Sequence, residues 1–170
     1  MALEALVPDA RRLAPDELQA RHGNSFLLFT AKQVAGHKSE SSTNLLLDGD
    51  DDEPAGRTAN LAVVVYPLRP RDSAQGSMVT LGRESRQDVV IPDMSVSRFH
   101  AFAKPGPDGA LVLQDAGSTN GTSVNGKSVL TAAAGPPRRL EPGDNVRLGH
   151  IELTFTDARA LREFALQTAR

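Results

Sequence analysis

The sequence predicts an all-β fold, a sandwich or small barrel, with an N-terminal extension and a short C-terminal helix. After residue 57, short apolar runs alternate with turn signals at intervals of about eight to twelve residues. These runs are rich in β-branched and aromatic residues, which suit the pleated surface of a sheet. The separators, such as PGPDG, GSTNG and EPGD, hold the Gly, Pro, Asp and Asn residues typical of turns. Because no helical spacing alternates with these runs, they indicate an all-β domain.

The N-terminal extension, residues 1–58, combines several kinds of segment. Residues 8–20 have the spacing of a short amphipathic helix, and Pro15 either weakens its middle or starts a second turn. Residues 25–30, SFLLFT, are short and apolar, as a strand would be. Residues 36–56 are polar and then acidic, with Gly and Pro, which predicts a flexible linker.

The β domain, residues 59–156, carries the strand-like runs. Strands are expected over residues 61–68, 77–81, 88–91, 99–103, 110–115, 145–149 and 151–155. In VNGK, residues 124–127, the central Asn-Gly pair favours a hairpin with a type I′ turn. In EPGD, residues 141–144, Gly143 occupies the position of a type II turn at which φ must be positive.

The C-terminal segment, residues 157–170, returns to helical spacing. Asp157 is a suitable N-cap, and Leu161, Phe164 and Ala165 fall on one face. We therefore expect a short amphipathic helix after the β domain.

Composition argues against several classes of function. The chain has 170 residues and a net charge of -2, so it has no global attraction to nucleic acid or to an anionic membrane. Aromatic residues make up only 4%, which leaves few stacking platforms for nucleic acid. The absence of cysteine excludes disulfides, thiolate metal sites and cysteine nucleophiles. The N-terminus does not resemble a signal peptide, and no apolar run approaches the roughly 18 residues that span a bilayer. A soluble cytoplasmic protein is expected.

The stretch GTSVNGKS, residues 121–128, matches the phosphate-binding loop pattern of nucleotide hydrolases. Such a loop must follow a buried strand and open a helix. Here the preceding strand is expected to end at residue 115, and Gly135, Pro136 and Pro137 would interrupt a helix after about two turns. The sequence therefore favours the hairpin over a nucleotide site.

Three blocks in the β domain carry residues suited to phosphate binding: LGRES (81–85), SVSRFHA (95–101) and DAGSTNGTSVNG (115–126). Binding a phosphomonoester requires a fixed cation, hydroxyl or N–H donors, and a backbone that can approach closely. The first two blocks supply guanidinium groups, whose planar fork matches phosphate oxygens, and a serine hydroxyl. The third supplies a Gly-flanked loop whose N–H groups can point outward.

In these blocks the sequence resembles the forkhead-associated (FHA) domain, a module that recognises phosphothreonine. The Gly-Arg of the first block, the Ser-Arg-x-His of the second, and the Gly-Ser-Thr-Asn-Gly-Thr and Val-Asn-Gly of the third follow the family's order and spacing. The resemblance extends over residues 60–156 and implies an FHA-like β-sandwich. It implies a signalling adaptor that acts downstream of a Ser/Thr protein kinase and binds a phosphothreonine-containing protein or peptide. No catalytic residue, cofactor, metal, nucleic acid or membrane partner is expected.

The resemblance also assigns roles to individual residues. Those that would bind the phosphopeptide are Arg83, Ser97, Arg98, Thr119 through its backbone, and Asn120, which would fix the peptide main chain. Those that would support the binding loops are Gly82, His100, Gly121 and Asn125.

Other functions fit these residues less well. A hydrolase would need serine where GSTNG has Thr119, and Ser97 and His100 enter one strand with no third group beside them. The four histidines are scattered without metal-ligand spacing. The alternative that stays open is a scaffolding module with an FHA-like fold that binds an unmodified protein partner.

A regulatory hypothesis concerns the linker. A kinase that modifies Thr43 or Thr58 would create a phosphothreonine that can occupy the domain's own site, because the tether gives a high effective concentration.

Overall fold

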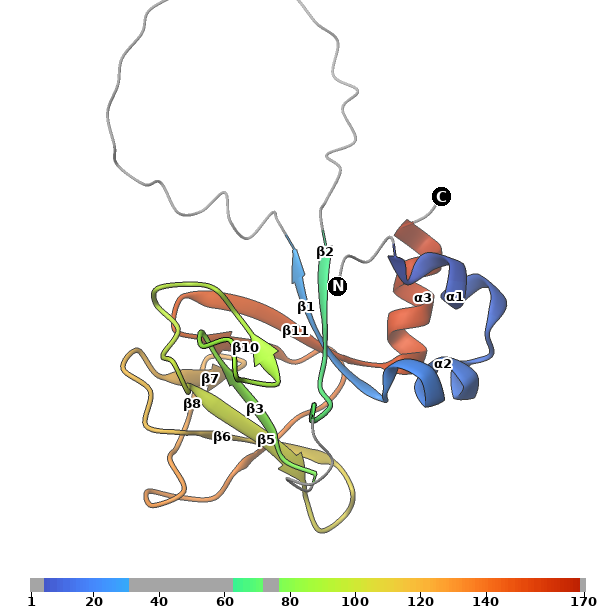
Figure 1. Ribbon diagram of the computed structural model, residues 1–170. Helices are drawn as coiled ribbons and strands as arrows, with labels where there is room; N and C mark the ends of the chain where they lie inside the picture. The colour runs from blue at the N-terminus through green and yellow to red at the C-terminus, as the bar shows by residue number, and fades with distance from the viewer. Residues whose placement is uncertain (1–4, 31–62, 72–76, 169–170) are drawn as a thin grey trace, which may run out of the picture.

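The computed structural model describes residues 5–30, 63–71 and 77–168, which form two β-sheets with three helices beside one of them (Figure 1). The strands are β1 (Ser25–Thr30), β2 (Val63–Pro67), β3 (Val79–Gly82), β4 (Val89–Val90), β5 (Ala101–Pro105), β6 (Leu111–Asp115), β7 (Thr122–Val124), β8 (Lys127–Val129), β9 (Arg138–Arg139), β10 (Asn145–Leu148) and β11 (Ile151–Asp157). The helices are α1 (Val7–Arg12), α2 (Pro15–His22) and α3 (Ala158–Thr168).

The two sheets confirm the predicted β-sandwich. The six-stranded sheet has the order β2-β1-β11-β10-β7-β8, and the five-stranded sheet has the order β4-β3-β5-β6-β9. Neighbouring strands run antiparallel, apart from β3 and β4, which pair in parallel. Each strand predicted in the β domain overlaps an observed strand.

One short strand of the described chain, β9, is not indicated by the sequence. It consists of Arg138 and Arg139, which are exposed and pair with Leu113 and Val112 at the edge of the five-stranded sheet. Two adjacent arginines show no alternation of apolar and polar residues, so they carry no strand signal.

The tight turns follow their predicted chemistry. Between β7 and β8, Asn125 has a φ of 51° and Gly126 a φ of 76°, as a type I′ turn requires. The stretch GTSVNGKS thus lies on this hairpin rather than before a helix. In EPGD, Gly143 has a φ of 97°, and the Asp144 N–H donates to the Glu141 carbonyl at 3.0 Å, in agreement with a type II turn.

The main core lies between the sheets and is built from inward-facing side chains of both. Its most deeply buried members, each at most 1% exposed, include Leu81, Leu113, Val146, Leu148 and Leu153. Burial of each such side chain stabilises the fold by about 1.5–3 kcal/mol. The strands that carry the site loops are therefore anchored in this core.

Strand β1 is buried on both faces. Leu27 belongs to the main core, whereas Phe26 and Leu28 belong to a second apolar cluster shared with the helices. Leu27 pairs with Tyr66 of β2 on one side and with Phe155 of β11 on the other. A segment that the sequence analysis placed in the N-terminal extension is thus an internal strand of the six-stranded sheet. A run that is apolar on both faces gains stability only when both faces are covered.

Two helices replace the single helix predicted over residues 8–20. Leu13 leaves the helical conformation with a ψ of 143°, and Pro15 takes the first position of α2, where its missing N–H costs nothing. At the other end of the chain, Asp157 Oδ1 accepts a hydrogen bond from the Ala160 N–H at 2.7 Å, which confirms the predicted N-cap of α3.

The second apolar cluster joins α1 and α3 to β1 and β2. It contains the predicted apolar face of α3, with Leu161 and Ala165 buried and Phe164 packed against them. None of the helices in the described ranges is long and apolar enough to cross a membrane. The linker predicted over residues 36–56, which contains Thr43, lies outside the described residues, and so does Thr58.

Candidate functional site

The loops that follow β3, precede β5 and join β6 to β7 meet at a surface groove. Its lining residues are Arg83, Glu84, Arg86, Ser97, Arg98, Phe99, Gly117 and Thr119. The structure therefore brings together four of the predicted phosphopeptide-binding residues: Arg83, Ser97, Arg98 and Thr119. Glu84, Arg86 and Phe99 also line the groove, although the sequence analysis did not select them.

Arg83 is held through both its backbone and its side chain. Its N–H donates to the Ser97 carbonyl at 3.0 Å, and its Nε donates to the Val96 carbonyl at 3.1 Å. Its Nη1 lies 3.8 Å from the sulfur of Met94. Because these contacts fix the plane of the guanidinium, its fork is oriented before any ligand arrives.

Gly82 lets the Arg83 loop and the Ser97 loop touch. A Cβ atom at Gly82 would lie 2.2 Å from the Arg98 carbonyl oxygen, which is too short for any real contact. A larger residue would push the two loops apart, so the predicted supporting role of Gly82 has a steric basis.

Ser97 and Thr119 join the second loop to the third. The Thr119 N–H donates to Ser97 Oγ at 3.0 Å, and Ser97 Oγ donates to Thr119 Oγ1 at 3.5 Å. Two hydroxyl groups and a backbone amide therefore lie side by side in the groove, next to the guanidinium of Arg83.

His100 connects the same two loops from beneath. It is fully buried; its Nδ1 accepts a hydrogen bond from the Ser97 N–H at 2.9 Å, and its Nε2 lies 3.1 Å from the Gly121 carbonyl. These partners require the neutral ring with its proton on Nε2. Burial lowers the pKa of His100, and the Gly121 carbonyl and the charge of Asp115 only partly offset this. A neutral ring that does not line the groove agrees with the predicted bracing role.

Asp115, at the end of β6, organises the third loop. Its carboxylate accepts hydrogen bonds from the N–H groups of Gly117 (2.7 Å) and Ser118 (2.9 Å) and from the hydroxyls of Ser118 and Thr122 (both 2.6 Å). Burial raises the pKa of Asp115, but these hydrogen bonds outweigh burial and bring it below its usual value. Asp115 is not among the site residues predicted from the sequence, although an Asp two residues before a Gly is a known turn signal.

Asn120 lies beside the groove rather than among its lining residues. Its side chain is exposed, and its Nδ2 donates to the Ser95 carbonyl at 2.8 Å. Ser95 is itself held in place, since its Oγ donates to Asp93 Oδ1 at 2.5 Å and accepts from the His150 N–H at 3.0 Å. The amide of Asn120 is thus oriented by the loop before β5.

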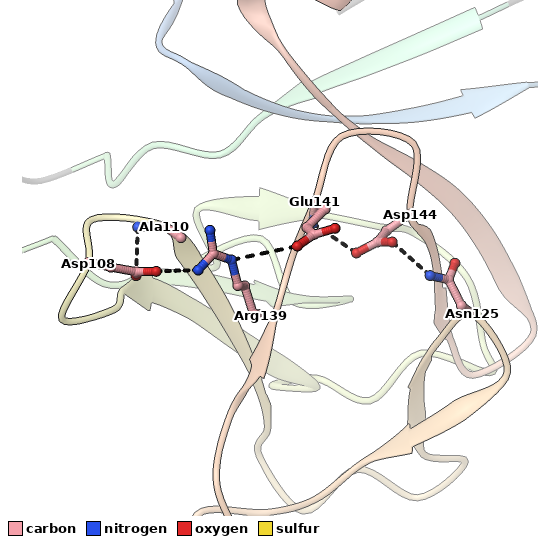
Figure 2. A network of polar contacts seen from close by, with 6 residues as sticks. All are labelled: Asp108, Ala110, Asn125, Arg139, Glu141 and Asp144. Atoms are coloured by element: carbon pink, nitrogen blue, oxygen red, sulfur yellow. Dashed lines mark hydrogen bonds and ion pairs between the residues drawn. The ribbon is translucent and has the colours of Figure 1, made fainter.

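Asn125 belongs to a surface network that includes none of the groove-lining residues (Figure 2). Its Nδ2 donates to Asp144 Oδ1 at 2.7 Å, and its Oδ1 accepts from the Asn145 N–H at 2.8 Å. The network continues from Asp144 through Glu141 to the ion pair of Arg139 with Asp108. Asn125 therefore fastens the β7–β8 turn to the start of β10.

The groove carries an excess of positive charge. Arg83, Arg86 and Arg98 line it together with one carboxylate, that of Glu84, which pairs with Arg86 Nε at 2.9 Å. Guanidinium, hydroxyl and amide groups are hydrogen-bond donors, so the arrangement suits an oxyanion. Within the described ranges, no group of His, Asp and Glu side chains is placed to hold a metal ion.

The comparisons with known proteins identify one family. The model of the FHA domain matches residues 79–149. The chain is 32% identical over 114 residues to the oxoglutarate dehydrogenase inhibitor of Corynebacterium efficiens, and this match covers 63% of the chain and 70% of the inhibitor. It is 34% identical over 110 residues to the ABC transporter ATP-binding/permease protein Rv1747 of Mycobacterium tuberculosis, which covers 65% of the chain but only 12% of the transporter. A solved structure from a study of phosphothreonine-dependent FHA domain interactions is 26% identical, with a TM-score of 0.46, and the match covers 78% of this chain and 95% of that one.

Proposed function

This chain belongs to the FHA domain family, and from that premise we propose that its groove binds phosphothreonine on a partner protein. One observation carries the proposal: residues from three separate loops place a guanidinium, two hydroxyls and a backbone amide in one groove. A phosphorylated threonine has a charge of about −1.5 to −2 at neutral pH and three acceptor oxygens, which match this set of donors.

The proposed roles follow the geometry. Arg83 binds the phosphate through its oriented fork, and Arg98 adds positive charge to the groove. Ser97 binds through its hydroxyl and Thr119 through its backbone N–H, and in the complex phosphate oxygens replace the acceptors that these two residues now provide for each other. Asn120 contacts the peptide main chain through its Oδ1, because its Nδ2 already donates to Ser95. Three or four charge-assisted hydrogen bonds, less the cost of ordering the peptide, are consistent with a Kd of about 1 μM.

In the cell, we propose that the protein is an adaptor downstream of a Ser/Thr protein kinase rather than an enzyme. The name of one relative, oxoglutarate dehydrogenase inhibitor, describes a protein that regulates an enzyme. By analogy, phosphorylation of a partner would create the ligand, and binding would change what that partner does. The competing function is a scaffolding module whose partner is unmodified.

The test is the affinity for a phosphothreonine peptide and for its unphosphorylated twin, measured by calorimetry with wild-type protein and Arg83→Ala. We expect phosphate-dependent binding by the wild type and a loss of about 10- to 150-fold in Arg83→Ala, since one charge-assisted hydrogen bond contributes roughly 1.5–3 kcal/mol.

The matched control is Arg159→Ala, which removes the same charge from an exposed arginine on α3. We expect it to retain wild-type affinity. Equal binding of the two peptides by the wild type would reject phosphothreonine recognition and support the scaffolding module.

A further inference from the structure

One large apolar side chain lies in a groove otherwise lined by charged, hydroxyl and glycine residues. Phe99 lines the groove beside Arg98 and is 43% exposed. An aromatic ring does not contribute to phosphate binding, because phosphate oxygens accept hydrogen bonds and the ring of phenylalanine has no donor. An exposed aromatic side chain beside a binding site is a feature of interaction surfaces.

The backbone directs Phe99 outward. The next residue, His100, is fully buried and fixed by two hydrogen bonds, and the ladder of β5 begins immediately after it with the buried Ala101. Phe99 stays partly exposed, although both residues that follow it are fully buried. It directly precedes the histidine that braces the groove loops.

The ring of Phe99 is also supported from one side. It stacks on Phe102 with ring centroids 6.3 Å apart and an angle of 28° between the planes. Phe102 lies on β5, where its backbone pairs with Thr80 of β3 and with Gln114 of β6, so it is held in the central strand of the five-stranded sheet. A supported ring loses little conformational freedom when a partner packs against it, which favours its use as a contact surface.

The charges around Phe99 determine which partner residue suits it. A cationic side chain would face Arg86 and Arg98, and the nearby carboxylate of Glu84 is already paired with Arg86 at 2.9 Å. An acidic side chain would pair with these arginines but would gain no favourable contact with the ring of Phe99. An apolar side chain can cover the exposed part of the ring without losing a charge partner.

We propose that Phe99 packs against an apolar side chain of the bound peptide and thereby selects partners with such a residue close to the phosphothreonine. This inference rests on the proposed function and adds the chemistry of the partner sequence to it. Phe99 is then a specificity-determining residue at the edge of the phosphate site.

The test uses phosphothreonine peptide libraries with three random positions on each side of the phosphothreonine. In each sub-library, one position is fixed as Phe, Ala or Lys. Binding is measured for wild-type protein, Phe99→Ala and Phe99→Leu, and the readout is the ratio of Phe-fixed to Ala-fixed affinity at each position. In the wild type we expect a ratio of about 10 at one position at least. The ratio should fall to about 1 in Phe99→Ala and stay in between in Phe99→Leu, which keeps an apolar side chain.

The readouts separate the inference from the function on which it rests. A wild-type ratio of about 1 at every position, a ratio unchanged in Phe99→Ala, or a preference for Lys over Phe would overturn the role of Phe99, while phosphate-dependent binding would still stand. Equal binding of phosphorylated and unphosphorylated libraries would overturn both. A uniform loss of affinity in Phe99→Ala with the ratio retained would identify the ring as a structural support only.

Discussion

At the scale of single residues, His100 links the folding of the domain to the shape of its groove. Its Nδ1 accepts from the Ser97 N–H and its Nε2 meets the Gly121 carbonyl, so the ring sets the distance between two groove loops. Protonation of Nδ1 would replace an acceptor with a donor that faces another donor. The neutral form of the ring is therefore the one that the folded state stabilises.

This leads to a pH dependence of stability. Burial lowers the folded-state pKa of His100 below the ordinary histidine value of 6.5, so between the folded-state pKa and the unfolded-state pKa the unfolded state binds more protons. The contribution of His100 is fully present above pH 6.5 and is lost as the pH falls through the folded-state pKa. We expect the free energy of unfolding, measured by urea denaturation, to decrease from about pH 7.5 to about pH 5.

His100→Ala supplies the comparison, because the other titrating groups remain. It should be destabilised by roughly 2–3 kcal/mol at neutral pH, since it leaves the Ser97 and Gly121 backbone groups without their partner. Its stability should also vary less with pH over the same interval. A pH profile as steep as that of the wild type would contradict the role assigned to the buried ring.

The sequence motifs predicted the site residues whose functional groups themselves suit phosphate. They did not predict the residues that matter because of where the fold places them. Arg83, Ser97 and Thr119 could be chosen because a guanidinium, a hydroxyl and a Gly-flanked amide each have an affinity for phosphate. Asp115 and Phe99 have no such signature. Asp115 is distinguished by a loop that folds onto its carboxylate, and Phe99 by its exposed position in the groove. Both features are consequences of tertiary structure.

At the scale of elements, the Asp157 cap can be tested by itself. Asp157→Ala removes the acceptor for the Ala160 N–H and should lower the free energy of unfolding by about 1 kcal/mol. Asp157→Asn should lose much less, because asparagine is an equally good N-cap. Chemical denaturation of the three proteins measures this, and equal losses in both variants would show that charge rather than capping is the source.

Strand positions could be predicted from periodicity and turn residues, but the sheet membership of β1 could not. Its partner on one side is β11, so Ser25 pairs with Asp157, a residue far away in the sequence. Local sequence contains no information about such a distant pairing. The division of residues 8–20 into two helices depended on whether Pro15 kinks a helix or begins one, and both are allowed by its chemistry.

At the scale of the whole molecule, the two apolar clusters stabilise different parts of the fold. The main core fixes the strands that carry the groove loops, whereas the second cluster attaches α1 and α3 to β1 and β2. None of the groove-lining residues belongs to the second cluster. Stability and ligand binding should therefore respond differently to a change there.

Leu161→Ala tests this separation. Leu161 is 1% exposed within the second cluster, so its truncation should cost about 2–5 kcal/mol in the free energy of unfolding. Leu130→Ala makes the same change at a leucine that is 45% exposed, and its cost should stay within about 0.5 kcal/mol. Below its melting temperature, Leu161→Ala should bind the phosphopeptide as the wild type does. A parallel loss of affinity would show that the helices are coupled to the groove.

The double-sided burial of β1 has a consequence for how the chain chooses between alternative alignments. A shift by one residue normally exposes apolar side chains and is penalised, but SFLLFT would present apolar side chains to both layers in either alignment. The correct choice must be enforced at the start of the strand. There the Leu68 N–H donates to the Ser25 carbonyl at 2.8 Å and the Ala158 N–H to the Asn24 carbonyl at 3.2 Å. These two backbone hydrogen bonds fix the register of β1 against its two neighbouring strands.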